Sequence, residues 1–103
     1  MKALWEPKAK EAKRRIAAYI RNEFGTKRAK KFRLEVDNTV TMLLRVPNIG
    51  QIDPLFEGRA KTYRSIIISG LNKMVYYIED DTVHIAAFWD TRMEPEEQAA
   101  RVR

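Results

Sequence analysis

Apolar residues recur at steps of three and four along the first half of the chain, a spacing that places them on one face of an α-helix. The first series spans residues 9–24 and follows Pro7, which fits a first helical turn because its missing N–H is not needed there. The second series spans residues 29–44, and Pro47 ends it. We therefore predict two amphipathic helices that pack as an antiparallel helical hairpin.

The predicted junction between these helices is two residues long. Gly25 is placed to end the first helix as a left-handed cap, since glycine has no Cβ to clash in that conformation. Thr26 can cap the second helix, because a hydroxyl there accepts a free backbone N–H. Because the connection is so short, the two helices must be neighbours in the fold.

The pattern changes after residues 48–61, which contain Gly50, Pro54 and Gly58, show no period and predict a loop. Runs rich in β-branched and aromatic residues then alternate with the turn candidates Ser69–Gly70 and Asp80–Asp81. Three strands in succession predict an antiparallel meander. The expected strands are residues 62–69, 71–79 and 82–90, with a short strand at Lys2–Trp5 before the first helix.

The predicted order is strand, helix, helix, strand, strand, strand, which is an α+β fold. The helical hairpin should cover one face of the sheet, leaving the other open to solvent or to a partner. The 103 residues allow one domain, 1–103. Residues 94–103, EPEEQAARVR, predict a short helix or a mobile tail.

The composition excludes several kinds of chemical site. The chain has no cysteine, which excludes disulfides and thiolate metal sites. It has one histidine, His84, which excludes metal sites built on paired histidines. No glycine-rich phosphate loop is present, so we expect neither metal nor cofactor. No stretch approaches the ~18 apolar residues of a membrane helix, and the charged N-terminus is unlike a signal peptide. We expect a cytoplasmic protein without a membrane partner.

The net charge is +6 and the pI is about 9.8. We favour the interpretation that this charge attracts polyanionic or acidic partners over the interpretation that it only keeps the protein soluble. The placement of the charges strengthens this interpretation, because acids such as Glu79, Asp80 and Asp81 come late. The basic residues of the first third are Lys8, Lys10, Lys13, Arg14, Arg15, Arg21, Lys27, Arg28, Lys30, Lys31 and Arg33.

An ordered set of short motifs begins with Tyr63–Arg64, an aromatic–basic pair, and continues with residues 73–76 (KMVY), a basic residue followed by an apolar–Val–Tyr stretch. This set resembles the motifs of the RelE/ParE superfamily. The acidic turn at 80–81, the apolar strand at 83–87 and the exit at Arg92 with Glu94–Pro95 follow in the family's order. The opening run LWEPKAKEAKRRIAAYIRNEFG is also similar to the family's first strand and helix.

This resemblance implies the toxin half of a bacterial type II toxin–antitoxin system, a plasmid stabilisation protein that inhibits growth until a cognate antitoxin neutralises it. The antitoxin would be an acidic or amphipathic segment that folds on the toxin surface. Two mechanisms occur on this fold. ParE-like toxins inhibit DNA gyrase, and RelE-like toxins cleave mRNA in the ribosome. The fold alone does not choose between them.

The resemblance assigns the nuclease role, if there is one, to three cations: Arg64, Lys73 and Arg92. Two departures count against a complete nuclease site. Ile66 stands where another basic residue is common, and no Tyr or His follows His84 to transfer a proton. Lys73 also replaces an Arg, losing the bidentate fork that grips phosphate.

We therefore favour gyrase inhibition over mRNA cleavage, and enzymatic activity stays open. A basic nucleic-acid-binding module without toxicity is a third interpretation. Isolated charges such as Arg64, Lys73 and Arg92 can also be solvated strand ends. His84 should have a structural role. Alternation should place Tyr76 and Tyr77 on opposite faces, so that at most one faces the core and the other is free to contact a partner.

Overall fold

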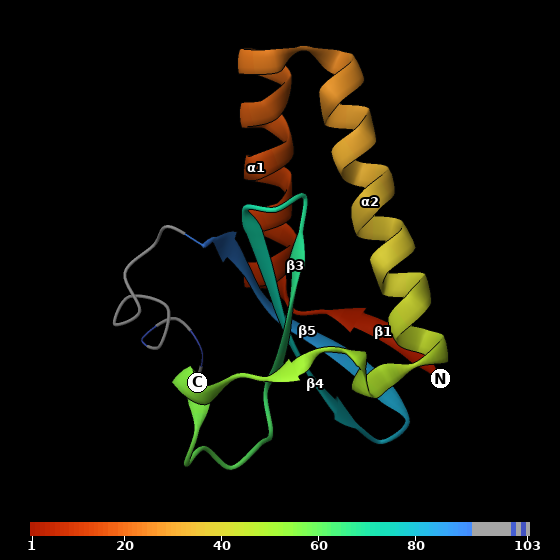
Figure 1. Ribbon diagram of the computed structural model, residues 1–103, viewed down its shortest axis with the longest axis vertical. Helices are drawn as coiled ribbons and strands as arrows, with labels where there is room; N and C mark the ends of the chain where they lie inside the picture. Colours follow the sequence, from red (N-terminus) through yellow and green to blue (C-terminus); the bar gives the residue numbers. More distant parts are fainter. Residues whose placement is uncertain (92–99, 101, 103) are drawn as a thin grey trace.

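The structure, a computed structural model, describes residues 1–91, 100 and 102 of the chain. Within them, a helical hairpin lies against one five-stranded sheet of order β1-β5-β4-β3-β2 (Figure 1). The α+β fold with an opening strand, a hairpin and a meander is confirmed. The elements are β1 (Lys2–Trp5), α1 (Pro7–Phe24), α2 (Thr26–Arg45), η1 (Pro47–Ile49), β2 (Gln51–Ile52), η2 (Pro54–Phe56), β3 (Arg64–Ile68), β4 (Asn72–Glu79) and β5 (Thr82–Asp90).

Strand β5 occupies a central place in the sheet. It pairs in parallel with β1 on one side and antiparallel with β4 on the other. The first and last strands are therefore neighbours, while β2 forms the far edge beside β3. Strand β2 was not predicted, since two residues are too few to show a period, and two short 3₁₀ turns lie in the segment expected to be a loop.

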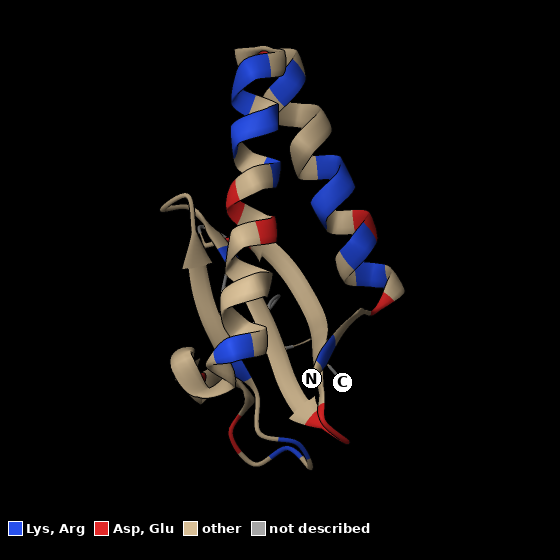
Figure 2. Ribbon diagram, turned by 90° about the vertical axis from the view of Figure 1, so that its right-hand side faces the viewer, with Lys and Arg blue, Asp and Glu red and all other residues tan. Residues whose placement is uncertain are grey.

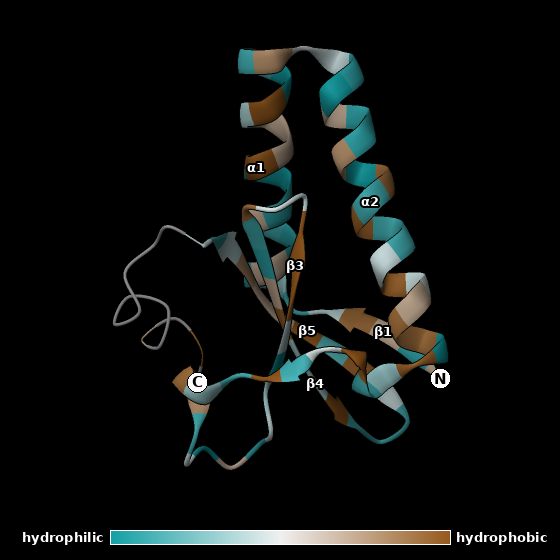
Figure 3. Ribbon diagram, viewed as in Figure 1, coloured by the Kyte–Doolittle hydropathy of each residue, from teal (hydrophilic) through white to brown (hydrophobic). Residues whose placement is uncertain are grey.

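The hairpin packs on the sheet mainly through the base of α1 and one side of α2. Ala9 and Ala12 are buried, and their small side chains let α1 lie close to β5. Phe32 of α2 meets Phe88 of β5 edge-to-face at 6.0 Å between ring centroids, and Trp5 lies 6.2 Å from the same ring. Figure 3 shows hydrophilic and hydrophobic segments alternating along both helices, as an amphipathic pattern requires.

The second face of the sheet is covered, which corrects the prediction that it is open. Phe56 and Tyr63 from the segment after α2 pack with Tyr77 and Trp89 of the sheet, and Val102 joins them. Tyr63 lies 5.5 Å from Tyr77 between ring centroids, and Phe56 lies 6.2 Å from Trp89. The predicted loop therefore carries a second core, because its aromatic side chains fold back on the strands.

Tyr76 and Tyr77 do point to opposite faces, but both are buried. Tyr76 belongs to the core beneath the helices, and Tyr77 belongs to the second core. The prediction that one of them is free for a partner was wrong, because it rested on an open second face.

The two helices meet at Gly25, whose backbone dihedrals are φ 96° and ψ 168°. The positive φ confirms that glycine is needed there, although the extended ψ is not the left-handed helical value expected. Gly25 also occupies the N-cap position of α2, whose first residue is Thr26. The prediction that Thr26 caps α2 was wrong, because a residue inside the first turn cannot accept that N–H.

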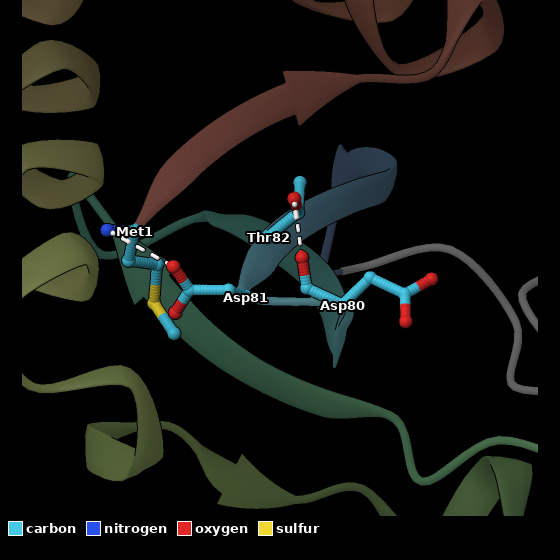
Figure 4. Close-up of polar contacts among 4 residues, drawn as sticks. All are labelled: Met1, Asp80, Asp81 and Thr82. Atoms are coloured by element: carbon cyan, nitrogen blue, oxygen red, sulfur yellow. Dashed lines mark hydrogen bonds and ion pairs between the residues drawn. The ribbon is translucent and has the colours of Figure 1, made fainter.

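Both predicted tight turns of the meander are present. Asp80 and Asp81 have φ of 54° and 57°, the two positive values that a type I′ hairpin turn requires. The Thr82 hydroxyl donates to the Asp80 carbonyl oxygen at 3.2 Å, and the amino group of Met1 lies 3.5 Å from the Asp81 carboxylate (Figure 4). The turn thus fixes the start of β1 beside β5.

Neither helix in the described part of the chain is long and apolar enough to cross a membrane.

Candidate functional site

Arg64 lies near the start of β3 and fastens the segment that follows α2. Its Nη1 donates to the carbonyl oxygens of Gly50 at 2.8 Å and Asn48 at 3.3 Å. The side chain is half-buried, so this guanidinium is already engaged with backbone oxygens. Arg64 is the first residue of β3 and anchors residues 48–50, so it is not a solvated strand end.

Tyr76 completes this anchor from the neighbouring strand. Its hydroxyl donates to the Pro47 carbonyl oxygen at 2.7 Å and accepts the Gly50 N–H at 2.9 Å. Burial raises the pKa of Tyr76, while the Gly50 hydrogen bond and the Arg64 charge act in the opposite direction. The phenol is therefore neutral at pH 7 and serves as a fixed donor, which suits a structural role.

Gly50 is required at this point by space rather than by its backbone angles. A Cβ at Gly50 would lie 2.5 Å from the Tyr76 hydroxyl and 2.9 Å from the Ser65 carbonyl oxygen. Such distances are too short for any side chain without movement of β3 or β4. Only glycine lets the chain after α2 approach the sheet so closely.

Lys73 lies on β4 and forms a buried ion pair with Asp53. Nζ of Lys73 is 2.5 Å from Oδ2 of Asp53, and the two side chains are only 12% and 4% exposed. Asp53 also accepts the Leu55 N–H through Oδ1 at 3.0 Å, which begins the turn η2. The ammonium group lies 5.7 Å from the centroid of the Phe56 ring. Lys73 is thus held inside the second core and is not a solvated strand end.

Arg64 and Lys73 lie on opposite faces of the sheet. Arg64 is paired in register with Tyr76, beneath the helices, whereas Lys73 shares its face with Val75 and Tyr77 of the second core. The sheet therefore separates two of the three cations assigned to a nuclease. Arg92 lies outside the described residues. The catalytic roles of Arg64, Lys73 and Arg92 stay predictions, and the geometry does not bring the first two together.

His84 has structural contacts in the strand. Its ring stacks on Tyr77 at 4.7 Å with an interplanar angle of 5°, and its Nε2 is 3.3 Å from the Glu79 carbonyl oxygen. The ammonium of Lys61 lies 4.1 Å from the Tyr77 ring, and a hydrogen bond with Tyr77 raises the pKa of Lys61. The Tyr77 hydroxyl donates to Glu6 at 3.1 Å. These contacts support the structural role predicted for His84.

The basic surface lies on the end of the hairpin that extends past the sheet, residues 16–33, which we call the hairpin tip (Figures 1 and 2). Six Lys and Arg against one acid give it a charge of +5, while the other 85 residues together carry +1. Its apolar side chains are unusually exposed: Tyr19 at 59% and Phe24 at 57%. The tip therefore joins concentrated positive charge to aromatic surface, as partner-binding sites do.

A groove of about 760 Å³ runs between the inner side of the hairpin tip and the β3–β4 turn. We call it the hairpin groove. Its middle is apolar, through Ile16, Ile20 and Phe32, and Arg28 and Lys31 are among the cations along it. This combination suits an amphipathic segment with acidic side chains. The full lining is Arg15, Ile16, Tyr19, Ile20, Phe24, Arg28, Lys31, Phe32, Glu35, Ser69, Leu71, Asn72 and Asp90.

Two features of the site could not be reached from the sequence. The partner of Lys73 is Asp53, twenty positions earlier in a segment without a period. The only sequence signal was a lysine in a predicted strand whose other residues are mostly apolar. The groove depends on the angle between hairpin and sheet, which no local pattern encodes.

Comparison with known proteins gives a match to a family model and matches to solved structures. A family model described as “ParE toxin of type II toxin-antitoxin system, parDE” matches residues 3–95. A solved structure from P. aeruginosa, described as a chromosomal ParDE TA system, aligns with a TM-score of 0.70. Its sequence identity is 18%, and the alignment covers 87% of this chain and 95% of that chain. At this identity the structural likeness shows the fold. The curated protein sequences give no match.

Proposed function

The chain belongs to the ParE toxin family of type II toxin–antitoxin systems, and on this premise we propose that it arrests bacterial growth by inhibiting DNA gyrase. Membership of such a system implies a cognate antitoxin as partner. We propose further that residues 1–103 act as a single toxin domain in the cytoplasm, where gyrase works on the chromosome. The activity we propose needs no metal, cofactor or membrane.

The observation that carries this proposal is the family match over residues 3–95. The geometry of the cations supports gyrase over mRNA as the target. Cleavage through the 2′-hydroxyl of RNA needs cations that converge on one phosphate. Arg64 is engaged with backbone oxygens on one sheet face, and Lys73 is paired with Asp53 on the other. Neither is placed to share a phosphate with the other.

The hairpin tip is the surface we propose for the target. Gyrase engaged on DNA presents phosphates, and a surface of +5 concentrated in eighteen residues is attracted to such a complex. Exposed Tyr19 and Phe24 add aromatic area that a protein partner can bury. The antitoxin then neutralises by laying an acidic amphipathic helix in the hairpin groove, beside the same cations.

A gyrase supercoiling assay run beside a toeprinting assay on programmed ribosomes tests this proposal. Wild type should block supercoiling and leave mRNA intact. The double variant Arg28→Glu/Lys31→Glu changes two exposed cations of the tip and should weaken inhibition at least about 10-fold, the lower end of electrostatic effects on association. Lys2→Glu/Lys10→Glu makes the same charge change at exposed positions outside the tip and should inhibit like wild type.

Two outcomes would overturn the proposal, and a third would overturn only the surface assigned to the target. Efficient mRNA cleavage by wild type with gyrase unaffected would establish the endonuclease interpretation. Normal growth of bacteria that express the soluble protein without antitoxin would favour a binding module without toxicity. Equal losses in the two double variants would remove the tip as the target surface while leaving gyrase as the target.

A further inference from the structure

The cations that α2 contributes to the hairpin tip fall into two sets. Arg28 and Lys31 line the hairpin groove. Lys27, Lys30 and Arg33 are equally exposed, but they are not among the residues that line that groove. The tip therefore has a second charged side, which the groove does not use.

This second side of α2 faces away from the core. Lys27 stands two residues before Ala29, and Lys30 stands two residues before Phe32. Ala29 and Phe32 are buried, and two residues of an α-helix are about 200° apart around its axis. Lys27 and Lys30 thus project outward, and Arg33 continues their row after a further step of three. We call these three cations the outer row.

The outer row keeps its charge free for a partner. In the part of the chain that the structure describes, none of its three members forms an ion pair. No acid stands in the first turn of α2. The next acid along the helix, Glu35, lines the hairpin groove and accepts the Ser69 hydroxyl there. The positive charge of the row is therefore not offset by its own helix.

The residues beside the row indicate the chemistry of that partner. Tyr19 and Phe24, the exposed aromatic side chains of the tip, both line the hairpin groove and so leave the outer row without an aromatic centre. Protein interfaces combine such a centre with a polar rim. A phosphate backbone, by contrast, is bound by cations alone. Side chains in a row of this spacing are about 5–6 Å apart, which suits successive phosphates of one strand.

The distribution of charge over the whole molecule favours an approach with the tip first. The turn between β4 and β5, residues 79–81, consists of three acids and lies toward the other end of the molecule from the hairpin tip (Figures 1 and 2). The longest dimension of the molecule is 40 Å. A polyanion attracts the basic end and repels the acidic end, which turns the tip toward it.

We propose that the outer row binds the phosphate backbone of duplex DNA. The two sides of the tip then have different partners: the aromatic groove side faces the gyrase protein, and the outer row contacts the DNA that gyrase holds. The choice of duplex DNA rests on the proposed function, because gyrase acts on duplex DNA. The contact itself belongs to the toxin, so it should be measurable without gyrase.

The direct test is fluorescence anisotropy of a labelled DNA duplex titrated with the full-length toxin in the absence of gyrase. Each phosphate neutralised contributes about −0.9 to the slope of log affinity against log salt concentration. Three contacts predict that affinity falls about 40-fold between about 50 and 200 mM salt. The variant Lys27→Gln/Lys30→Gln should bind more weakly at the lower concentration and lose only about 3- to 4-fold over the same interval.

The matched control is Arg28→Gln/Lys31→Gln, which makes the same charge change on the same helix but on the groove side. It should keep the salt dependence of wild type. Lys27→Arg/Lys30→Arg keeps the outer charges and should keep that dependence as well. Glutamine and arginine are both good helix formers, and circular dichroism checks that all variants are folded.

Three results would overturn the proposal. One is the absence of DNA binding by folded wild type at about 50 mM salt. Another is the same reduction of slope in Lys27→Gln/Lys30→Gln and Arg28→Gln/Lys31→Gln, which would mean diffuse attraction to the whole tip. The third is a clear preference for single-stranded RNA over the duplex in competition, which would assign the row to a different nucleic acid.

A supercoiling assay on the same proteins keeps this inference separate from the proposed function. Wild type that inhibits gyrase but does not bind DNA by itself would reject the inference and leave gyrase as the target. Wild type that binds the duplex through the outer row but leaves supercoiling unaffected would support the DNA contact and reject the proposed function. If both hold, Lys27→Gln/Lys30→Gln should also inhibit gyrase less strongly than wild type.

Discussion

The hairpin tip and the sheet beneath it are built from opposite kinds of residue. The tip carries +5 in eighteen residues and exposes Tyr19 and Phe24, while the sheet has a buried core on each face. Buried apolar surface supplies stability, and exposed charge supplies attraction for partners. We therefore expect substitutions in the sheet to lower stability and substitutions in the tip to weaken partner binding, each without the other effect.

The largest expected contrast compares one phenylalanine from each region. Phe88 is 2% exposed and packs against Trp5 and Phe32, so Phe88→Ala should cost about 3–5 kcal/mol of unfolding free energy. Phe24 contacts Tyr19 and Arg28 at the surface, so Phe24→Ala should cost at most about 1 kcal/mol. Urea denaturation followed by circular dichroism measures both. Similar losses would show that the tip contributes to the common core.

The second contrast tests whether Lys73 stabilises the sheet or takes part in a functional site. Lys73→Met should cost about 3 kcal/mol, because it leaves the buried Asp53 carboxylate without its partner. The double variant Asp53→Asn/Lys73→Met should recover most of that loss, since the amide keeps an acceptor for the Leu55 N–H. Thermal denaturation of the four proteins in this cycle gives the coupling.

The same cycle guards against a misleading result. If Lys73→Met lost growth arrest because it unfolds, the double variant should regain arrest with stability. A Lys73→Met protein that keeps wild-type stability but loses toxicity would instead point to a functional role for this ammonium.

The third contrast concerns two glycines. Gly50→Ala should lower the global unfolding free energy by about 1–3 kcal/mol, because the new methyl group meets Tyr76 and the Ser65 carbonyl inside the sheet region. Gly25→Ala meets no atom within 4 Å, and its strain comes from the positive φ at the tip. The tip can relieve that strain by local opening.

Amide hydrogen exchange separates the two effects. Gly50→Ala should speed exchange in β3 and β4, and Gly25→Ala should speed it only beside the helix junction. Global destabilisation by Gly25→Ala of the same size would mean that the tip and the sheet unfold as one unit.

How far the sequence predicted this structure differs between the two regions. The helices, the tight turns and the three meander strands could be predicted because periodicity and turn residues act locally. The covering of the second face of the sheet could not be predicted, because Phe56 and Tyr63 lie in a segment whose only recognisable sequence signals are glycine and proline. The partners of the candidate cations were missed for the same reason. Arg64 binds the Gly50 carbonyl and Lys73 binds Asp53, contacts that exist only after the segment folds back.

The smallest expected effect is a pH dependence located in the sheet region. Burial raises the pKa of Tyr76 above its ordinary value of 10.0, so the folded state keeps this proton when the unfolded chain loses it. Stability should be constant below about pH 10 and fall as the pH rises above it, with a slope of at most about 1.4 kcal/mol per pH unit from this group. Burial raises the pKa of Tyr63 in the same direction.

Urea denaturation between pH 8 and 11 measures this slope. The unfolding free energy of the variant Tyr76→Phe should fall less steeply with pH than that of wild type, because the variant has one fewer tyrosine whose pKa is raised by burial. An unchanged slope would assign the alkaline loss to other groups, Tyr63 among them.

The neighbouring positions of β1 and β5 have a consequence for the order of events during synthesis. Residues 2–5 are synthesised about eighty residues before their sheet partner, residues 82–85. At about 5–20 residues per second, β1 waits roughly 4–16 s for that partner. The sheet that supports the hairpin cannot form before residues 82–85 have been made. The folded toxin therefore appears only after this interval, during which antitoxin already present can reach the nascent chain.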